Sequence, residues 1–180
     1  MPDISFNTTA NETIEREKLV CYMNMGTITP GTGDPYIDWQ PLGKRVTDSS
    51  ESYDWSDETA IDILGAQRTI LHTPLMQQTF DPVKLDSADS PAVKVWNTAI
   101  KERRARGLTH YDLLIVHLYA EHSTGYAFAE EYDACAVYPT GIGGAGGGDV
   151  EMPIEVRFGG TRTTGKAAIA DGILTFTADT

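Results

Sequence analysis

The chain has 180 residues, a formal net charge of −12 and a hydrophobic content of 41%. The length predicts one domain with one substantial core, and the composition excludes a wholly disordered protein. The excess of carboxylates disfavours a surface that binds nucleic acid or an anionic membrane. No apolar run reaches the ~18 residues of a membrane span, so we expect no membrane partner.

The first segment of the chain, residues 1–17, is polar and has no hydrophobic period. We interpret it as a flexible N-terminal arm, and residues 18–180 as a single β domain. The segment lacks the basic start and the apolar stretch of a Sec-type signal peptide. The glycosylation sequons at Asn7 and Asn11 therefore carry little weight.

Alternating apolar residues predict strands along the first half of the domain. The first runs from Leu19 to Met25, and a second lies around residues 36–42. Residues 52–64 predict one long strand, and residues 68–80 predict its partner, so the two form a long hairpin. Pro74 indicates an edge or a bulge in the second of these strands.

The predicted strand over residues 52–64 has two unlike faces, because successive side chains of a strand point to opposite sides. One face is bulky and mostly apolar. The other is small, polar and acidic, with the carboxylates of Asp54, Glu58 and Asp62.

One helix is predicted, with Ser90 as its N-cap and Pro91 at its first position. Apolar residues then recur at helical spacing, and Gly107 is expected to end the helix. The basic run Lys101–Arg106 suits the negative end of the helix dipole. That interpretation is favoured over a nucleic-acid patch, and an acidic surface of a partner subunit is a further target for these cations.

The second half of the chain predicts further strands, over residues 113–120, 134–138 and 153–158. The dipeptide Asp171-Gly172 lies between two apolar segments, which is typical of a two-residue hairpin turn. With eight or nine strands and one helix, the expected fold is mainly β, an antiparallel sandwich or barrel with one flanking α-helix.

A glycine-rich stretch, residues 139–153, includes G-x-G-x-x-G at Gly141, Gly143 and Gly146. A dinucleotide-binding loop needs a helix directly after it and an acid about 20 residues on. Here the stretch contains three further glycines, Gly144, Gly147 and Gly148, which are followed by Asp149. Pro153 then prevents a helix. We expect no bound cofactor, and predict instead a pliable loop in which glycine lets other backbones come close.

The remaining candidates for chemistry are weak. His117, Glu121 and His122 are spaced one residue too far apart for a known inverted zinc motif, so no metal site is expected. Cys21 and Cys135 lie in apolar segments and are interpreted as buried free thiols rather than a disulfide or metal site. No nucleophile elbow or carboxylate pair stands out, so the chain is not expected to be an enzyme.

Several segments, taken in order, resemble the major tail protein, or tail tube protein, of long-tailed bacteriophages with non-contractile tails. These are YDWSDETAIDILG at 53–65, TFDPVKLDSADSPAVKVWNTAI at 79–100, YDLLIVHLYA at 111–120 and FAEEYDACAVYPTGIGGAGGGDVEMPIEVRFGGTRTTGKA at 128–167. The resemblance covers residues 50–180, and residues 1–50 match no motif of the family.

The resemblance implies a structural virion protein of the phage tail, assembled in the host bacterial cytoplasm. Its subunits would self-assemble into hexameric rings that stack into a tube, with strands of each subunit, the long hairpin among them, joining an inter-subunit β-barrel. The implied partners are further copies of the chain, the tape-measure protein in the lumen, and the tail terminator and distal tail proteins. DNA would pass through without specific binding.

Within that role the sequence suggests two sites. Asp54, Glu58 and Asp62 would face the lumen and repel DNA, which carries about one negative charge per ~1.7 Å; the alternative is a solvated outer face. The glycines of the loop, Gly141 to Gly148, would lie at a contact between subunits or rings. The alternative for the whole protein is a monomeric β-sandwich module that binds a protein or carbohydrate partner.

Overall fold

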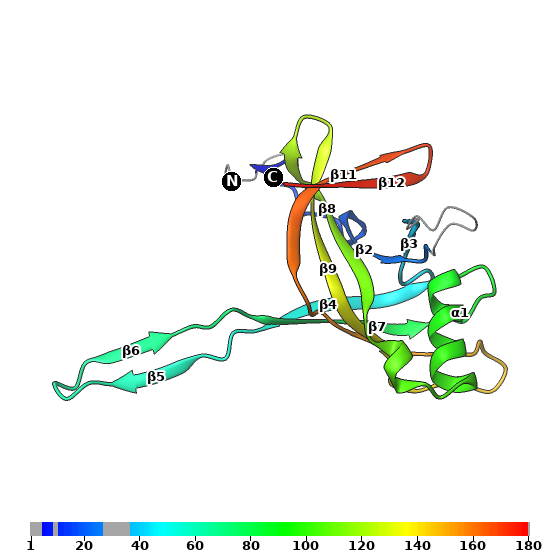
Figure 1. Cartoon of the computed structure of the whole chain (residues 1–180), viewed down its shortest axis with the longest axis horizontal. Coiled ribbons are helices and arrows are strands. Elements are labelled where there is room, and N and C mark those ends of the chain that lie inside the picture. Colours follow the sequence, from blue (N-terminus) through cyan, green and yellow to red (C-terminus); the bar gives the residue numbers. More distant parts are fainter. Residues whose placement is uncertain (1–4, 9–10, 27–36, 180) are drawn as a thin grey trace.

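The computed structural model describes residues 5–8, 11–26 and 37–179 of the chain, and Figure 1 shows their arrangement. The fold is mainly β with one flanking α-helix, which confirms the predicted fold class. The expected second strand begins at a residue outside the described part, and the structure has β3 (Trp39–Pro41) in this region. Within the predicted N-terminal arm, β1 (Ser5–Phe6) pairs with β8. A 3-10 turn, η1 (Arg16–Lys18), spans the boundary between that arm and the predicted domain.

One large antiparallel sheet forms the body of the molecule, in the order β3-β2-β8-β9-β10-β7-β4. The strands β11 and β12 extend it, because β11 pairs with the first half of β9 while β10 pairs with the second half. The bounds are β2 (Leu19–Asn24), β4 (Val46–Asp54), β7 (Leu75–Val83), β8 (Tyr111–Ser123), β9 (Tyr126–Pro139), β10 (Ile154–Arg157), β11 (Arg162–Ala170) and β12 (Ile173–Ala178).

A second, two-stranded sheet continues the β4–β7 pair away from the body. It consists of β5 (Glu58–Ile61) and β6 (Gln67–Ile70), which project from the rest of the molecule in Figure 1. The long hairpin predicted from the sequence is therefore present. The single strand predicted over residues 52–64 is wrong, because the strand is broken after Asp54.

The helix α1 (Ser90–Trp96) continues into a π-helical turn, η2 (Asn97–Lys101). The predicted N-cap is wrong: the cap is Asp89, whose carboxylate accepts a hydrogen bond from the Ala92 N–H at 3.2 Å. The predicted end is also wrong, because the helix ends at Lys101. Gly107 lies in a separate 3-10 turn, η3 (Ala105–Leu108).

The core lies on both faces of β8, which explains its run of consecutive apolar residues. Leu113 and Ile115 point to the larger cluster, which includes side chains of β2, β7, β9, β10 and α1. Leu114 and Val116 point to the smaller cluster, under β3, β11 and β12. A strand buried on both faces needs apolar residues at every position rather than at every second one.

The C-terminal hairpin confirms the turn predicted from its Asp-Gly dipeptide. Asp171 and Gly172 join β11 to β12 and have φ angles of 51° and 78°. Positive φ at both central residues is the geometry of a type I′ turn, which matches the twist of the flanking strands.

Candidate assembly surface at the projecting hairpin

The break in the hairpin follows from side chains that bind their own backbone. The Asp54 carboxylate accepts a hydrogen bond from the Ser56 N–H at 2.9 Å, and Ser56 has a φ of 44°. On the opposite strand the break contains Pro74, which has no N–H to donate to a ladder. One backbone bond, from the His72 N–H to the Trp55 carbonyl at 3.0 Å, spans the gap.

The tip of the hairpin is closed by Asp62. Its carboxylate accepts hydrogen bonds from the Leu64 and Ala66 N–H groups, both at 2.9 Å. Gly65 has a φ of 81°, a conformation that other residues adopt only with strain. Asp54 and Asp62 are therefore also the residues that shape the two bends of this arm.

The register of the outer hairpin shows which side chains share a face. Glu58 lies opposite Ile70, and Ala60 lies opposite Arg68. Directly opposed residues of an antiparallel pair point to the same side. The face that carries Glu58 therefore also carries a cation and an apolar side chain, which the sequence pattern of the first strand alone did not reveal.

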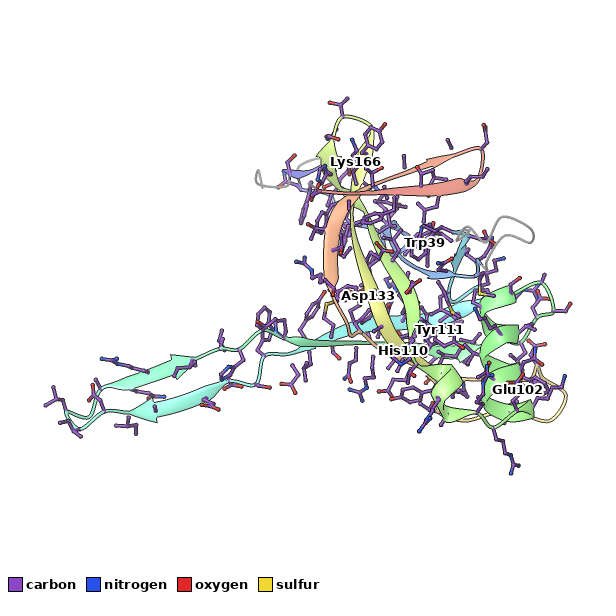
Figure 2. The ribbon with its side chains drawn as sticks, viewed as in Figure 1. Trp39, Glu102, His110, Tyr111, Asp133 and Lys166 are labelled. Atoms are coloured by element: carbon purple, nitrogen blue, oxygen red, sulfur yellow. The ribbon has the colours of Figure 1, made fainter. Side chains whose placement is uncertain are left out.

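Both faces of this outer hairpin are exposed, as the side chains in Figure 2 show. Ile63 and Leu64, at the tip, are 102% and 88% exposed, and Ile61 is 72% exposed. Isolated two-stranded hairpins are marginally stable in water, and clusters of exposed apolar side chains mark interaction sites. The hairpin thus has the properties of a surface that another molecule covers.

A hollow of about 610 Å³ lies where the hairpin leaves the body. Aromatic rings dominate its wall: Tyr53 and Trp55 stack with ring centroids 6.4 Å apart, and Tyr132 and Phe158 lie 5.1 Å apart. The other lining residues are Thr73, Pro74, Leu75, Met76, Glu130, Gly159, Gly160 and Arg162.

A buried carboxylate, Glu130, forms part of this wall. It accepts hydrogen bonds from His117 Nε2 at 3.0 Å, the Tyr132 hydroxyl at 3.0 Å and Arg162 Nε at 2.5 Å. Burial by itself would raise the pKa of Glu130, but the hydrogen bonds from His117 and Arg162 outweigh it and lower that pKa to about 2. The cluster is therefore anionic at its centre and fixed in geometry.

A second carboxylate, Glu51, lies near this cluster on β4. It accepts a hydrogen bond from the Tyr53 hydroxyl at 3.1 Å, and its other oxygen is buried without a partner. Desolvation by burial raises the pKa of Glu51. No local pattern in the sequence indicates Glu51 or Glu130. The partners of Glu130 come from β8 and β11 as well as from its own strand, β9, and these strands are far apart in the chain.

The histidines singled out from the sequence have separate partners. His117 lies against Glu130, and the second histidine, His122, lies 2.8 Å from the Asp179 carboxylate. No group of three or more potential metal ligands occurs among the residues that the structure describes. Within the same ranges, no helix is long and apolar enough to cross a membrane.

The two cysteines are buried and free, as predicted. Burial raises the pKa of the Cys135 thiol to about 11 and that of Cys21 well above its usual range, so both are thiols at neutral pH. The basic run at the end of the helix is exposed, and Arg104 forms an ion pair with Glu102 at 3.5 Å.

The glycine-rich loop joins β9 to β10 and is exposed throughout residues 140–150. Its base is held by backbone bonds between Gly143 and Glu151, at 2.9 and 2.7 Å. Gly144 requires glycine, since a Cβ there would lie 2.2 Å from the Asp149 carbonyl oxygen. Gly141, Gly143, Gly146 and Gly147 have no neighbouring atom within 4 Å of an added Cβ. Their predicted role at a subunit contact remains a prediction.

No protein-family model matches the chain, and no curated protein matches its sequence. Among solved structures, one similar chain comes from the PVC sheath-tube complex of an extracellular contractile injection system in the extended state. It is 7% identical with a TM-score of 0.49, over 87% of this chain and 94% of that one. Another comes from the sheath/tube terminator of the PVC system, with 8% identity, a TM-score of 0.47 and coverage of 87% and 99%. Both TM-scores lie below 0.5, so neither likeness establishes a shared fold.

Proposed function

We propose that this chain is a structural subunit that assembles with copies of itself into a hollow tube. The observation that carries the proposal is the outer hairpin β5–β6, which leaves the body with both faces exposed and with apolar side chains at its tip. Such an arm is poorly stable on its own and is stabilised when a neighbouring molecule covers it.

The sheet edges support the same proposal. Among the described residues, β4 pairs only with β7, and β12 pairs only with β11. Open edges normally recruit other strands, and a closed ring of subunits uses this tendency to form a barrel without edges. We propose that such pairing joins the strands of neighbouring subunits.

The order of the sequence segments that resemble tail tube proteins supports a finer version of the proposal. In it, hexameric rings stack into the tail tube of a bacteriophage with a non-contractile tail, and DNA passes through the tube during genome ejection. The tape-measure protein would occupy the lumen before ejection, and terminator and distal tail proteins would bind the ends. The protein would thus belong to the virion, after assembly in the host cytoplasm.

The lumen and loop assignments form part of this proposal. Asp54, Glu58 and Asp62 would face the lumen and keep DNA from adhering by like-charge repulsion. The exposure of Asp54 and Glu58 supports such a position. The glycine loop, Gly141 to Gly148, would lie at a contact between subunits or rings, where the space around Gly146 admits another backbone.

The direct test is to shorten the hairpin. Asp54 lies opposite Leu75, so replacing residues 55–74 by Asn-Gly closes β4 and β7 with a two-residue turn. We expect the purified wild-type chain to form rings or tubes under negative-stain electron microscopy. The shortened chain should keep its cooperative thermal unfolding and remain small in analytical ultracentrifugation. A wild-type chain that stays monomeric at high concentration, or a shortened chain that still forms tubes, contradicts the proposal.

A second candidate function is a monomeric module that binds a protein or carbohydrate. The observation that favours it is the aromatic hollow at the root of the hairpin, since stacked rings beside a few polar groups are typical of ligand sites. Sizing separates the two candidates: a persistent monomer whose Trp55 fluorescence responds to oligosaccharides or a peptide supports the module.

A further inference from the structure

We propose that the hairpin tip of one copy docks into the aromatic hollow at the hairpin root of a second copy. This inference rests on the proposed tube function and names the two surfaces that meet. The tip contributes the side chains of Ile63 and Leu64, and the hollow contributes the rings of Tyr53, Trp55, Tyr132 and Phe158.

The tip and the hollow are two exposed apolar surfaces that match each other. The tip side chains are almost wholly exposed, while the hollow has a volume of about 610 Å³ and aromatic walls. Tyr53 and Trp55 are themselves 43% and 49% exposed. Burial of apolar surface drives association, and rigid aromatic pockets filled by an apolar anchor are where binding energy concentrates.

The charge of the tip is opposite to the exposed charge of the hollow. Between residues 59 and 67 the only charged side chain is Asp62. Two charged side chains line the hollow, and of these Glu130 is only 9% exposed, whereas Arg162 is 52% exposed. A docked tip therefore brings its one carboxylate to a hollow whose exposed charge is the guanidinium of Arg162, which binds the buried Glu130 through its Nε. Complementary charges of this kind set the orientation of an interface.

The length of the arm determines which tip can reach which hollow. The tip and the root belong to the same arm, and about nine extended residues separate them, which corresponds to about 30 Å. A tip therefore cannot reach its own hollow. Two copies in the same orientation, displaced along the arm by about its length, bring the tip of one to the root of the next. Such a head-to-tail contact repeats from copy to copy without closing, as the stacking of subunits along a tube requires.

The occupant is a second copy rather than a small ligand because the chain itself supplies an exposed apolar anchor of matching polarity. Docking would also place Asp62 beside Arg162, so that Asp54 and Glu58 would be the carboxylates left to face the lumen. The hollow would be closed in the tube and open in the isolated subunit.

The test is a cross-link between copies. In the variant Leu64→Cys/Thr73→Cys, one thiol lies at the tip and the other in the wall of the hollow; the native thiols are buried. Mild oxidation of assembled tubes should give a ladder of covalent oligomers on a non-reducing gel. A matched control, Leu64→Cys/Ser87→Cys, has its second thiol at an exposed position beside α1 and should give none.

A second variant tests the contact without added thiols. Ile63→Ser/Leu64→Ser removes the apolar anchor outside the core, so the chain should unfold at the wild-type temperature while the yield of tubes falls at least tenfold. Wild-type tubes without a ladder from Leu64→Cys/Thr73→Cys, or full assembly of the serine variant, overturn the docking but leave the tube intact. A wild-type chain that forms no tubes overturns the proposed function itself. Trp55 quenching by an oligosaccharide in assembled tubes would show that the hollow stays open, and would also overturn the docking.

Discussion

At the scale of single residues, Glu130 is the most informative side chain for stability. Replacing it with Gln keeps the shape but turns one acceptor oxygen into a donor that faces other donors. Breaking a buried ion pair costs about 3–5 kcal/mol; because Arg162 is half-exposed, we expect Glu130→Gln to lower the free energy of unfolding by about 2 kcal/mol. Urea denaturation measures this change. The control Glu102→Gln, at an exposed ion pair, should change it by less than ~0.5 kcal/mol.

The same residue predicts how stability depends on pH. The folded protein lowers the pKa of Glu130 from 4.5 to about 2, so the unfolded chain binds this proton more readily than the folded one. The stability contributed by Glu130 is therefore fully present above about pH 5 and is lost as pH falls toward 2. Urea denaturation between pH 2 and pH 7 should show this fall in the wild type. The fall should be smaller in Glu130→Gln. If the free energy of unfolding depends on pH equally in the two proteins, the lowered pKa does not belong to Glu130.

At the scale of elements, the start of α1 offers a test between sequence and structure. The sequence favours Ser90 as the N-cap, whereas the structure has the Asp89 carboxylate in that role. Asp89→Ala should therefore lower the free energy of unfolding by about 1 kcal/mol. Ser90→Ala, at an exposed position, should change it by less than ~0.5 kcal/mol. A larger loss of unfolding free energy in Ser90→Ala than in Asp89→Ala would show that Ser90 is the N-cap.

The glycine loop offers a test of assembly that is separate from stability. Gly146 has open space around it and no positive φ, so Gly146→Val should leave the thermal midpoint within a few degrees of the wild type. If the loop lies at a subunit contact, the added side chain should reduce tube yield in negative-stain images. The control Ala170→Val adds volume at an exposed strand position outside the loop and should assemble normally. Normal assembly of Gly146→Val would place the loop away from contacts.

The elements show why some features could be predicted from the sequence and others could not. The Asp171-Gly172 turn and the free cysteines follow from local chemistry and were correct. The break after Asp54 depends on a side chain that binds its own backbone, which competes with an otherwise regular strand pattern. The hollow and the Glu130 cluster depend on strands distant in sequence, so no local pattern indicates them.

At the scale of the whole molecule, the charge on the projecting arm predicts how fast DNA passes through the tube. A triple variant removes three carboxylates of the arm: Asp54→Asn, Glu58→Gln and Asp62→Asn. The new side chains keep an oxygen acceptor for the bends at both ends of the arm. Tubes should still form, because Ile63 and Leu64 keep the apolar anchor of the docked tip and only the charge of Asp62 toward Arg162 is lost there. Without these carboxylates the cation of Arg68, on the same face as Glu58, is left to attract phosphates, so DNA should pass more slowly.

The measurement is the rate of genome ejection from virions that carry the triple variant, with tube length checked by electron microscopy. A matched variant, Glu12→Gln, Glu102→Gln and Asp171→Asn, removes the same number of charges at exposed positions outside the arm and should eject at the wild-type rate. The delay should shrink as ionic strength rises, because salt screens the attraction between Arg68 and DNA beyond the Debye length, which is about 8 Å at physiological ionic strength and shorter above it. Wild-type ejection kinetics in the triple variant, at every salt concentration, would show that this face lies outside the lumen.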